Sequence, residues 1–158
     1  MTNGEEHNMK ALLLMGCPEL PVQTAAALYI ANKLNLEGFE VTAAGNKAAI
    51  SLLLNSDPEK HYIKKVMDLD RCIGALAEKK MEIDLCFVFI HSDSGISYLA
   101  TVKSLSKAKT VAVIFGKEIE PLIEASGDSV IIAARAVHNP TPLRAQIDGV
   151  KSWAALRK

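Results

Sequence analysis

The sequence has few aromatic residues and no long apolar run. Phe, Trp and Tyr make up 5% of its 158 residues, and no stretch approaches the roughly 20 consecutive apolar residues of a membrane-spanning helix. The first eight residues are polar and acidic, unlike the basic start and apolar centre of a signal peptide. We therefore expect a cytoplasmic protein that does not act at a membrane.

Cysteine pairs and an excess of basic charge are also absent. Cys17, Cys72 and Cys86 form no CxxC motif, which argues against a redox or zinc motif and is typical of a reducing compartment. Lys plus Arg number 18 and Asp plus Glu number 18, so the formal net charge is zero. A nucleic-acid-binding domain usually shows a basic excess or stripe, so we expect no nucleic-acid partner. A surface without net charge repels its own copies little, which favours a homo-oligomer.

Three well-known nucleotide-binding and catalytic motifs are missing as well. No GxGxxG follows the first apolar run, which argues against a standard NAD site, and no GxxxxGK[ST] phosphate loop is present. No GxSxG nucleophile elbow occurs either. The sequence therefore leaves the cofactor unknown and does not decide whether the protein is an enzyme.

What the sequence does have is a regular alternation of apolar runs and amphipathic stretches. Hydrophobic residues make up 49% of the chain, mostly Ala, Leu, Ile and Val, which suits strands buried between helices. The alternation predicts βαβ units. We expect a disordered tail over residues 1–9 and one α/β domain over 10–158. Its fold should be a three-layer α/β/α sandwich around a mainly parallel, doubly wound sheet of five or six strands, Rossmann- or flavodoxin-like.

The expected elements follow from periodicity and from Gly, Pro and capping residues. Strands are predicted over residues 10–15, 39–44, 85–90, 110–115 and 129–137, with 61–67 either a short strand or irregular. Helices are predicted over 21–38, 47–54, 68–80, 92–106 and 118–125. A last helix should begin after the N-cap Thr141 and place four apolar side chains on one face, those of Leu143, Ile147, Val150 and Ala154.

Polar and glycine residues gather where the predicted strands end. In an open parallel sheet, ligands bind outside the carboxyl ends of the strands. The candidates there are Gly16, Cys17 and Glu19; Asn46 and Lys47; His91, Asp93 and Ser94; Gly116 and Lys117; His138 and Asn139. We expect ligand contacts from members of this set, although doubly wound domains generally have polar strand ends.

Cys17 is the most informative of these residues. It lies a few residues before the first predicted helix, whose positive end favours a thiolate, and Pro18 and Pro21 restrict its loop. Glu19 opposes this, because a nearby carboxylate disfavours the thiolate. Two interpretations remain open: a reactive thiol, or a small buried residue where a strand meets a helix.

Two histidines follow strands at the same expected edge. With Cys17, His91 and His138 could form a Cys/His/His metal site or a Cys–His pair for nucleophilic catalysis. Both could equally be polar loop residues. We take Cys17 and His138 as the candidate catalytic pair and assign no metal ligands.

Two arginines occupy unfavourable places in the predicted elements. Arg135 interrupts the last apolar run, so it lies on an edge strand facing solvent, or it meets a carboxylate or an anionic ligand. Arg144 stands in the first turn of the last helix, where an acidic partner or an anion would offset the helix dipole. With Lys47, Arg135 is the candidate contact for a small anionic ligand.

Four segments give the chain a resemblance to a known family: residues 14–19 (Leu-Met-Gly-Cys-Pro-Glu), 45–46 (Gly-Asn), 57–59 (Asp-Pro-Glu) and 132–140 (Ile-Ala-Ala-Arg-Ala-Val-His-Asn-Pro). The chain resembles a small family of uncharacterised proteins from methanogenic archaea. The resemblance implies a three-layer α/β/α fold, an archaeal cytoplasm and no assigned activity, and it carries over no catalytic residue.

Two functions fit these observations. The first is a domain that binds a small ligand or cofactor and uses Cys17 as a reactive thiol. The second is a non-catalytic homodimer, or a subunit of a larger complex, in which the strand-end residues are structural.

Overall fold

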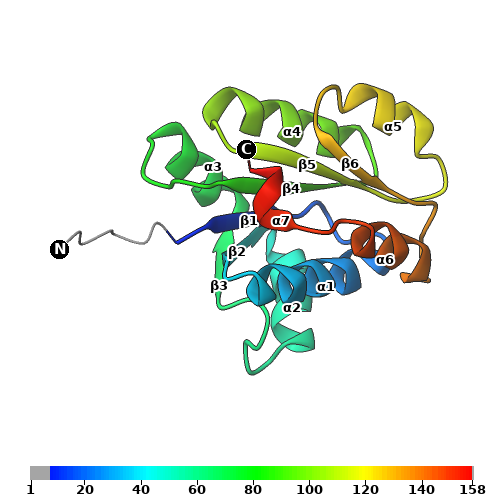
Figure 1. The fold of residues 1–158 in the computed structure, drawn as a ribbon, viewed down its shortest axis with the longest axis horizontal. Coiled ribbons are helices and arrows are strands. Elements are labelled where there is room, and N and C mark those ends of the chain that lie inside the picture. The colour runs from blue at the N-terminus through cyan, green and yellow to red at the C-terminus, as the bar shows by residue number, and fades with distance from the viewer. Residues whose placement is uncertain (1–7, 158) are drawn as a thin grey trace.

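The sheet has six parallel strands in the order β3-β2-β1-β4-β5-β6 (Figure 1). The computed structural model describes residues 8–157, so most of the predicted tail, residues 1–7, lies outside the described residues. The strands are β1 (Lys10–Leu14), β2 (Glu40–Gly45), β3 (Lys65–Asp68), β4 (Leu85–Ile90), β5 (Lys109–Ile114) and β6 (Val130–Ala133). The predicted α/β fold is confirmed, and the uncertain segment before residue 68 contains an edge strand.

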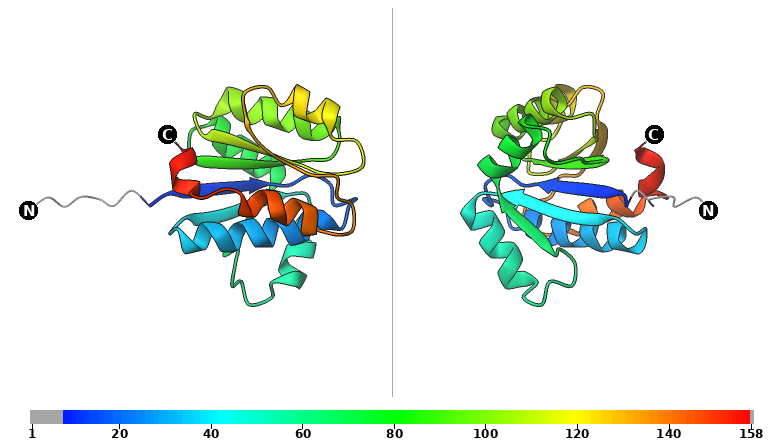
Figure 2. Two further views of the ribbon diagram at one scale, coloured as in Figure 1. Left: turned by 45° about the vertical axis from the view of Figure 1, so that its right-hand side comes forward. Right: turned by 90° about the vertical axis from the view of Figure 1, so that its left-hand side faces the viewer.

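Helices cover both faces of this sheet, as the two views of Figure 2 show. The helices are α1 (Val22–Leu36), α2 (Lys47–Ser56), α3 (Leu69–Ala77), α4 (Asp93–Leu105), α5 (Glu120–Ala125), α6 (Thr141–Asp148) and α7 (Trp153–Leu156). One core cluster joins the sheet to α1, α2, α6 and α7, and a second joins it to α3, α4 and α5. Within the described part of the chain, no helix has the length and apolar character needed to cross a lipid bilayer.

The strand sequences explain why β1 and β4 lie at the centre. All six residues of β4 are buried, as expected for a strand with a helix layer on each face. Alternate residues of β1 feed the two cores: Leu13 belongs to the α1 side, whereas Leu12 and Leu14 belong to the α3 side. The edge strands β3 and β6 are short, with four residues each.

Side-chain caps set the starts of two helices. The Asn46 side chain accepts a hydrogen bond from the backbone N–H of Ala49 and so caps α2. Asp68 does the same for the first turn of α3 through Asp70 and Arg71. Asn46 and Asp68 are therefore fixed at the starts of α2 and α3.

The last strand is shorter than predicted. We expected residues 129–137, but β6 ends at Ala133 because β5, its neighbour in the sheet, ends at Ile114. Beyond β6, the N–H of Ala134 still donates to the carbonyl of Ile114, and the N–H of Gly116 donates to the carbonyl of Ala136 in an isolated antiparallel bridge. Residues 134–137 are therefore joined to β5 by single bonds, and Arg135 is not a strand residue.

The last helix is also not continuous. Thr141 is its first residue rather than its cap, and it ends at Asp148, which leaves Val150 between α6 and α7. The carboxylate of Glu37, at the end of α1, accepts hydrogen bonds from the backbone N–H groups of Trp153 and Ala154. This contact starts a new helix in a different direction, which the periodicity of the segment does not reveal.

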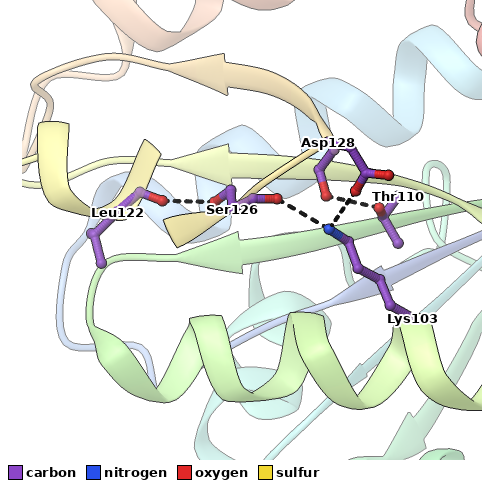
Figure 3. A network of polar contacts seen from close by, with 6 residues as sticks. Lys103, Thr110, Leu122, Ser126 and Asp128 are labelled. Carbon is purple, nitrogen blue, oxygen red and sulfur yellow. Dashed lines mark hydrogen bonds and ion pairs between the residues drawn. The ribbon is translucent and has the colours of Figure 1, made fainter. Parts of the chain in front are cut away.

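A polar network holds the turn between α5 and β6 (Figure 3). The ammonium group of Lys103 on α4 donates to the carbonyl of Ser126 at 3.1 Å and to the carboxylate of Asp128 at 2.9 Å. The Ser126 hydroxyl donates to the carbonyl of Leu122 at 2.7 Å. Gly127, between Ser126 and Asp128 in the sequence, has a φ of +62°, which residues other than glycine rarely adopt. The network fixes the start of β6, at the amino ends of the strands.

Candidate functional site

The centre of the sheet contains the point where the winding direction changes. The chain leaves β1 for α1 on one face and leaves the adjacent β4 for α4 on the other. Helices departing to opposite faces leave a crevice outside the strand ends, which is where ligands bind in open α/β sheets. Residues 16–21 follow β1 there, and residues 91–92 follow β4.

The backbone of the loop after β1 is held at several points. The carbonyl of Cys17 accepts a hydrogen bond from the N–H of Glu19 at 2.9 Å, which forms a three-residue turn around Pro18. The N–H of Val22, at the end of the loop, donates to the carbonyl of Val137 at 3.1 Å. The loop that carries Cys17 is therefore ordered on both sides of the thiol.

His91 reaches the same loop from β4. Its Nε2 lies 3.0 Å from the carbonyl oxygen of Cys17. A carbonyl oxygen only accepts, so Nε2 carries a proton and, in the neutral ring, Nδ1 is left as an acceptor. The ring also packs against Phe115 at a centroid distance of 5.6 Å. His91 therefore joins the loops after two adjacent strands.

A buried glutamine supports the loop from below. Gln23, on the first turn of α1, is 1% exposed, and its Nε2 donates to the carbonyl of Gly16 at 3.0 Å. Its Oε1 is buried and has no hydrogen-bond partner within the described chain. A methyl group added at Gly16 would lie 3.7 Å from this oxygen and 3.9 Å from Nε2 of His91. Gly16, Gln23 and His91 thus meet beneath the loop.

The three thiols differ in access. Cys17 is exposed, whereas Cys72 and Cys86 are buried. Burial raises the pKa of the Cys72 thiol to about 11. Burial, together with the charge of Cys72, also raises the pKa of Cys86. The two buried thiols therefore stay protonated and inert at neutral pH. Cys17 is not the small buried residue of the second interpretation, because it is exposed.

Beside the loop lies a groove of about 530 Å³, which we call the switch-point crevice. It is lined by Glu19, Leu20, His91, Ser92, Asp93, Gly116, Lys117, Glu118, Pro121, Leu122 and Val137. Its charged groups are three carboxylates against one ammonium group, and His91 is also in the lining. Cys17 is not a lining residue, although Glu19 and Leu20 of the same loop line the crevice.

Residues 134–138 cross this edge of the sheet as a strap. The bridge between Ala136 and Gly116 and the contact of Val137 with Val22 tie it to both β5 and α1. Arg135 is exposed on the strap and pairs with the carboxylate of Glu120, one of the two partners expected for it. His138 is exposed at its end, and no hydrogen bond joins it to Cys17 within residues 8–157.

The other candidates are spread along the same edge. Asp93 lines the crevice, and the Ser94 hydroxyl contacts that of Ser92 at 2.9 Å. Lys47 is exposed on α2, and the side chain of Asn139 accepts from the N–H of Thr141 at the start of α6. Asn46 and Asn139 are thus engaged in helix starts. The structure brings Gly16, Cys17, Glu19, His91 and Asp93 together, and leaves Lys47 and Arg135 outside the crevice lining.

Arg144 has the acidic partner expected of it. Its guanidinium contacts the carboxylate of Asp148 at 3.7 Å and lies over the ring of Tyr29, 4.9 Å from the centroid. Asp148 also accepts a hydrogen bond from the hydroxyl of Tyr29. These contacts join α6 to α1 and leave Arg144 in a structural role.

The alternative metal site is not formed. Among residues 8–157, no group of three or more His, Cys, Asp or Glu side chains is placed to hold a metal ion. Cys17 and His91 meet through a backbone carbonyl, and His138 lies at the end of the strap. Among the described residues, Cys17, His91 and His138 therefore form no three-ligand metal site.

Gln23 is a site residue that the sequence analysis missed. Helical spacing offered a signal, because the buried positions of α1 include Gln23 together with Val22, Ala26 and Ala27. A polar side chain on the apolar face of a helix must find a partner in the interior. Here that partner is the backbone of the loop before α1.

Comparisons with known proteins agree with this fold and identify the family. An uncharacterised protein of Methanocaldococcus jannaschii, MJ0452, is 36% identical over 140 residues, which span 85% of this chain and 92% of that protein. The solved structure of MT0777 is 40% identical, with a TM-score of 0.80, over 88% of this chain and 94% of its own. A family 9 glycosyl transferase from Veillonella parvula shares the fold alone, at 13% identity and a TM-score of 0.57 over 94% of this chain and 41% of that one. The model of the DUF1890 family, a domain of unknown function, matches residues 12–150, so the chain belongs to that family, as its resemblance to uncharacterised archaeal proteins predicted.

Proposed function

We propose that the protein binds a small ligand in the switch-point crevice and presents the Cys17 thiol to it as a reactive group. The observation that carries the proposal is the exposed thiol on a loop whose backbone is held by His91 and Gln23. A site whose geometry is fixed before the ligand arrives loses less entropy on binding. Here Gln23, which is buried, and His91, which is half-buried, both bond the backbone of the loop that carries the thiol.

The lining of the crevice indicates which ligand groups it accommodates. Glu19, Asp93 and Glu118 outnumber Lys117, and Nδ1 of neutral His91 is an acceptor. Acceptors and negative charge favour a ligand that carries amine or amide donors. The small anionic ligand expected from Arg135 and Lys47 is less favoured here, because neither residue lines the crevice.

A reactive Cys17 would act as a nucleophile toward an electrophilic group held in the crevice. In the alkylation used as a test, the sulfur forms a bond to carbon, iodide leaves, and the thiol proton goes to solvent. Cys72 and Cys86 provide internal standards, because their burial opposes the thiolate on which the reaction depends. Three free thiols also suit a reducing cytoplasm, where we place the protein.

The test is the rate of iodoacetamide labelling of each cysteine in the folded protein at pH 7, read by peptide mass spectrometry. We expect Cys17 to react at least about tenfold faster than a small model thiol of ordinary pKa near 8.5, and the other two cysteines to stay unlabelled. The variant Cys17→Ser should leave no fast-labelling site. Labelling of Cys17 no faster than the model thiol would remove the reactive-thiol part of the proposal.

A second candidate function is assembly into a homodimer. Four large apolar side chains are exposed in the described chain, Leu36, Leu52, Leu54 and Tyr62. All four belong to α1, α2 or the loop after α2, and a hydrogen bond from Asn35 to the carbonyl of Tyr62 holds this loop against the end of α1. Exposed apolar side chains gathered on one layer indicate an interaction surface, and a second copy is the partner that a neutral surface favours.

A further inference from the structure

A second groove lies at the opposite edge of the sheet, beside the amino ends of β1, β2 and β3. Its volume is about 530 Å³. It lies between β3, the loop before β3 and the loop of residues 80–83 after α3. Six basic side chains line it: Lys10, Lys60, Lys64, Lys65, Arg71 and Lys80. We call it the basic groove.

The strand register explains why the groove is open. Lys10 pairs with Glu40, and Thr42 pairs with Lys65. These polar residues lie on the same face of the sheet as α3 and α4, which cover the carboxyl ends of the strands but not this corner. In a parallel sheet with a helix over each face, such positions are normally apolar. Because α3 is only nine residues long, this corner of the sheet is left as the wall of a groove.

Positive charge in the groove exceeds what its carboxylates neutralise. Glu40 and Glu82 are the acidic residues of the lining. Lys65 lies 3.9 Å from Glu40, and Lys80 is paired with Glu78 at 2.7 Å, outside the lining. Within residues 8–157, the side chains of the other four basic residues form no ion pair. One third of the 18 basic residues of a chain with no net charge thus surround one groove.

Apolar side chains lie among these charges. Met67, Met81 and Ile83 line the groove, are each half-buried and belong to the α3 side of the sheet. Two of the three are methionines, whose flexible side chains adapt to a flat or irregular surface. The groove therefore offers apolar contact together with a rim of cations.

We infer that the basic groove binds an organic phosphate that carries an aromatic or apolar group, as a nucleotide does. Its volume lies in the range of small-ligand sites, and phosphate groups would meet the unpaired cations. The inference goes beyond the proposed function, because this groove and the switch-point crevice lie at opposite edges of the sheet.

Two other interpretations fit the groove less well. Lysines on an edge strand prevent pairing with other sheets, which accounts for Lys65 on β3 but not for Lys10, Arg71 and Lys80 on other segments. A nucleic acid would track its phosphates along an extended basic surface. Glu40 and Glu82 interrupt such a track, which favours a compact ligand.

The first experiment measures binding of ATP, inorganic triphosphate and adenosine to the whole protein by calorimetry at low salt. We expect ATP to bind more tightly than triphosphate, because only ATP also contacts the apolar side chains. Adenosine should bind more weakly than either, because it lacks phosphate. Absence of ATP binding would overturn the inference, and so would a single-stranded RNA that binds far more tightly than ATP with a steep salt dependence.

A pair of variants then locates the site. Lys64→Gln with Arg71→Gln removes two unpaired cations, and we expect ATP affinity to fall by up to about fivefold for each charge. The matched control is Lys107→Gln with Lys151→Gln, two exposed lysines outside the groove, which should leave the affinity unchanged. Backbone NMR shifts on adding ATP should move at residues 64–67 and 80–83. Equal weakening by both pairs, or shifts confined to residues 16–23 and 91–93, would overturn the assignment to this groove.

Discussion

The Nε2 atom of His91 lies 3.0 Å from the backbone carbonyl oxygen of Cys17 and joins the loops after β4 and β1. These loops follow neighbouring strands whose helices leave to opposite faces of the sheet. The histidine therefore acts as a positioning residue. Its Nε2 proton bonds the backbone of Cys17 and so fixes the loop that carries the thiol.

The first prediction concerns this contact. Replacing His91 with Leu removes the donor and leaves the carbonyl of Cys17 with the single bond from Glu19. We expect urea unfolding to show a loss of about 0.5–1.5 kcal/mol, the usual net value of one hydrogen bond.

The variant His91→Gln is the control, because its amide can still donate. Equal losses for the Leu and Gln variants would show that ring packing on Phe115, rather than the hydrogen bond, holds the loop. Nitrogen NMR of the imidazole gives an independent readout, since the neutral ring should be the tautomer with its proton on Nε2.

The interior of the sheet could be predicted from the sequence because burial alone determines it. The apolar run of β4 predicts its bounds, residues 85–90, since a strand covered on both faces has no polar position. The last strand was predicted too long because an apolar sequence alone does not make a strand. Apolar residues continue past Ala133, but a strand also needs a partner, and β5 ends at Ile114.

Contacts between distant segments could not be predicted. The strand-end rule placed Cys17 and His91 at one edge, but only the pairing of β1 with β4 brings them into contact. The same rule placed His138 there, and no hydrogen bond joins it to Cys17 within residues 8–157. The break before α7 depends on Glu37, 116 residues from Trp153. The basic groove likewise combines segments that show no basic stripe in the sequence.

The second prediction concerns Gln23. Replacing it with Glu places an ionised carboxylate where the amide donor now meets the carbonyl of Gly16. The site is 1% exposed, so the charge would be buried without a partner. We expect a loss of about 3–5 kcal/mol in the free energy of unfolding at pH 7, as for other uncompensated buried charges.

Lowering the pH should restore part of this loss, because a protonated carboxyl can donate to Gly16. The matched control is Gln146→Glu on the exposed face of α6, which should change stability by less than about 0.5 kcal/mol. A Gln23→Glu variant as stable as the wild type would show that the amide is not held beneath the loop.

The third prediction is a pH dependence that arises from Asp57, in the loop between α2 and β3. Burial opposes ionisation of this carboxyl, but hydrogen bonds from the backbone N–H groups of Tyr62, Ile63 and His61 outweigh it and lower its pKa. Its contribution to stability is therefore present above the pKa of an unfolded Asp, about 3.9. It is lost as the pH falls below that value through the lower folded pKa.

The variant Asp57→Asn tests this dependence. At pH 7 we expect it to be about 1.5–3 kcal/mol less stable than the wild type, the value of hydrogen bonds to a charged group. The difference should shrink below about pH 4 as the wild-type carboxyl takes up a proton. Glu124→Gln, on an exposed carboxyl of α5, should show no such trend, and a difference that stays constant down to pH 3 would contradict the role of the charge.

The fourth prediction tests the homodimer. Leu52 and Leu54 on α2 are 44% and 37% exposed, and their burial between two copies would remove apolar surface from water. Light scattering after gel filtration should show a dimer at micromolar concentration. The double variant Leu52→Lys with Leu54→Glu keeps the net charge at zero and should be monomeric. Ala100→Lys with Ala125→Glu makes the same change on the α4 and α5 layer, where it should leave the dimer intact. A wild-type protein that is monomeric at these concentrations would leave ligand binding as the function to pursue, because the apolar side chains on α2 would then have no second copy to cover them.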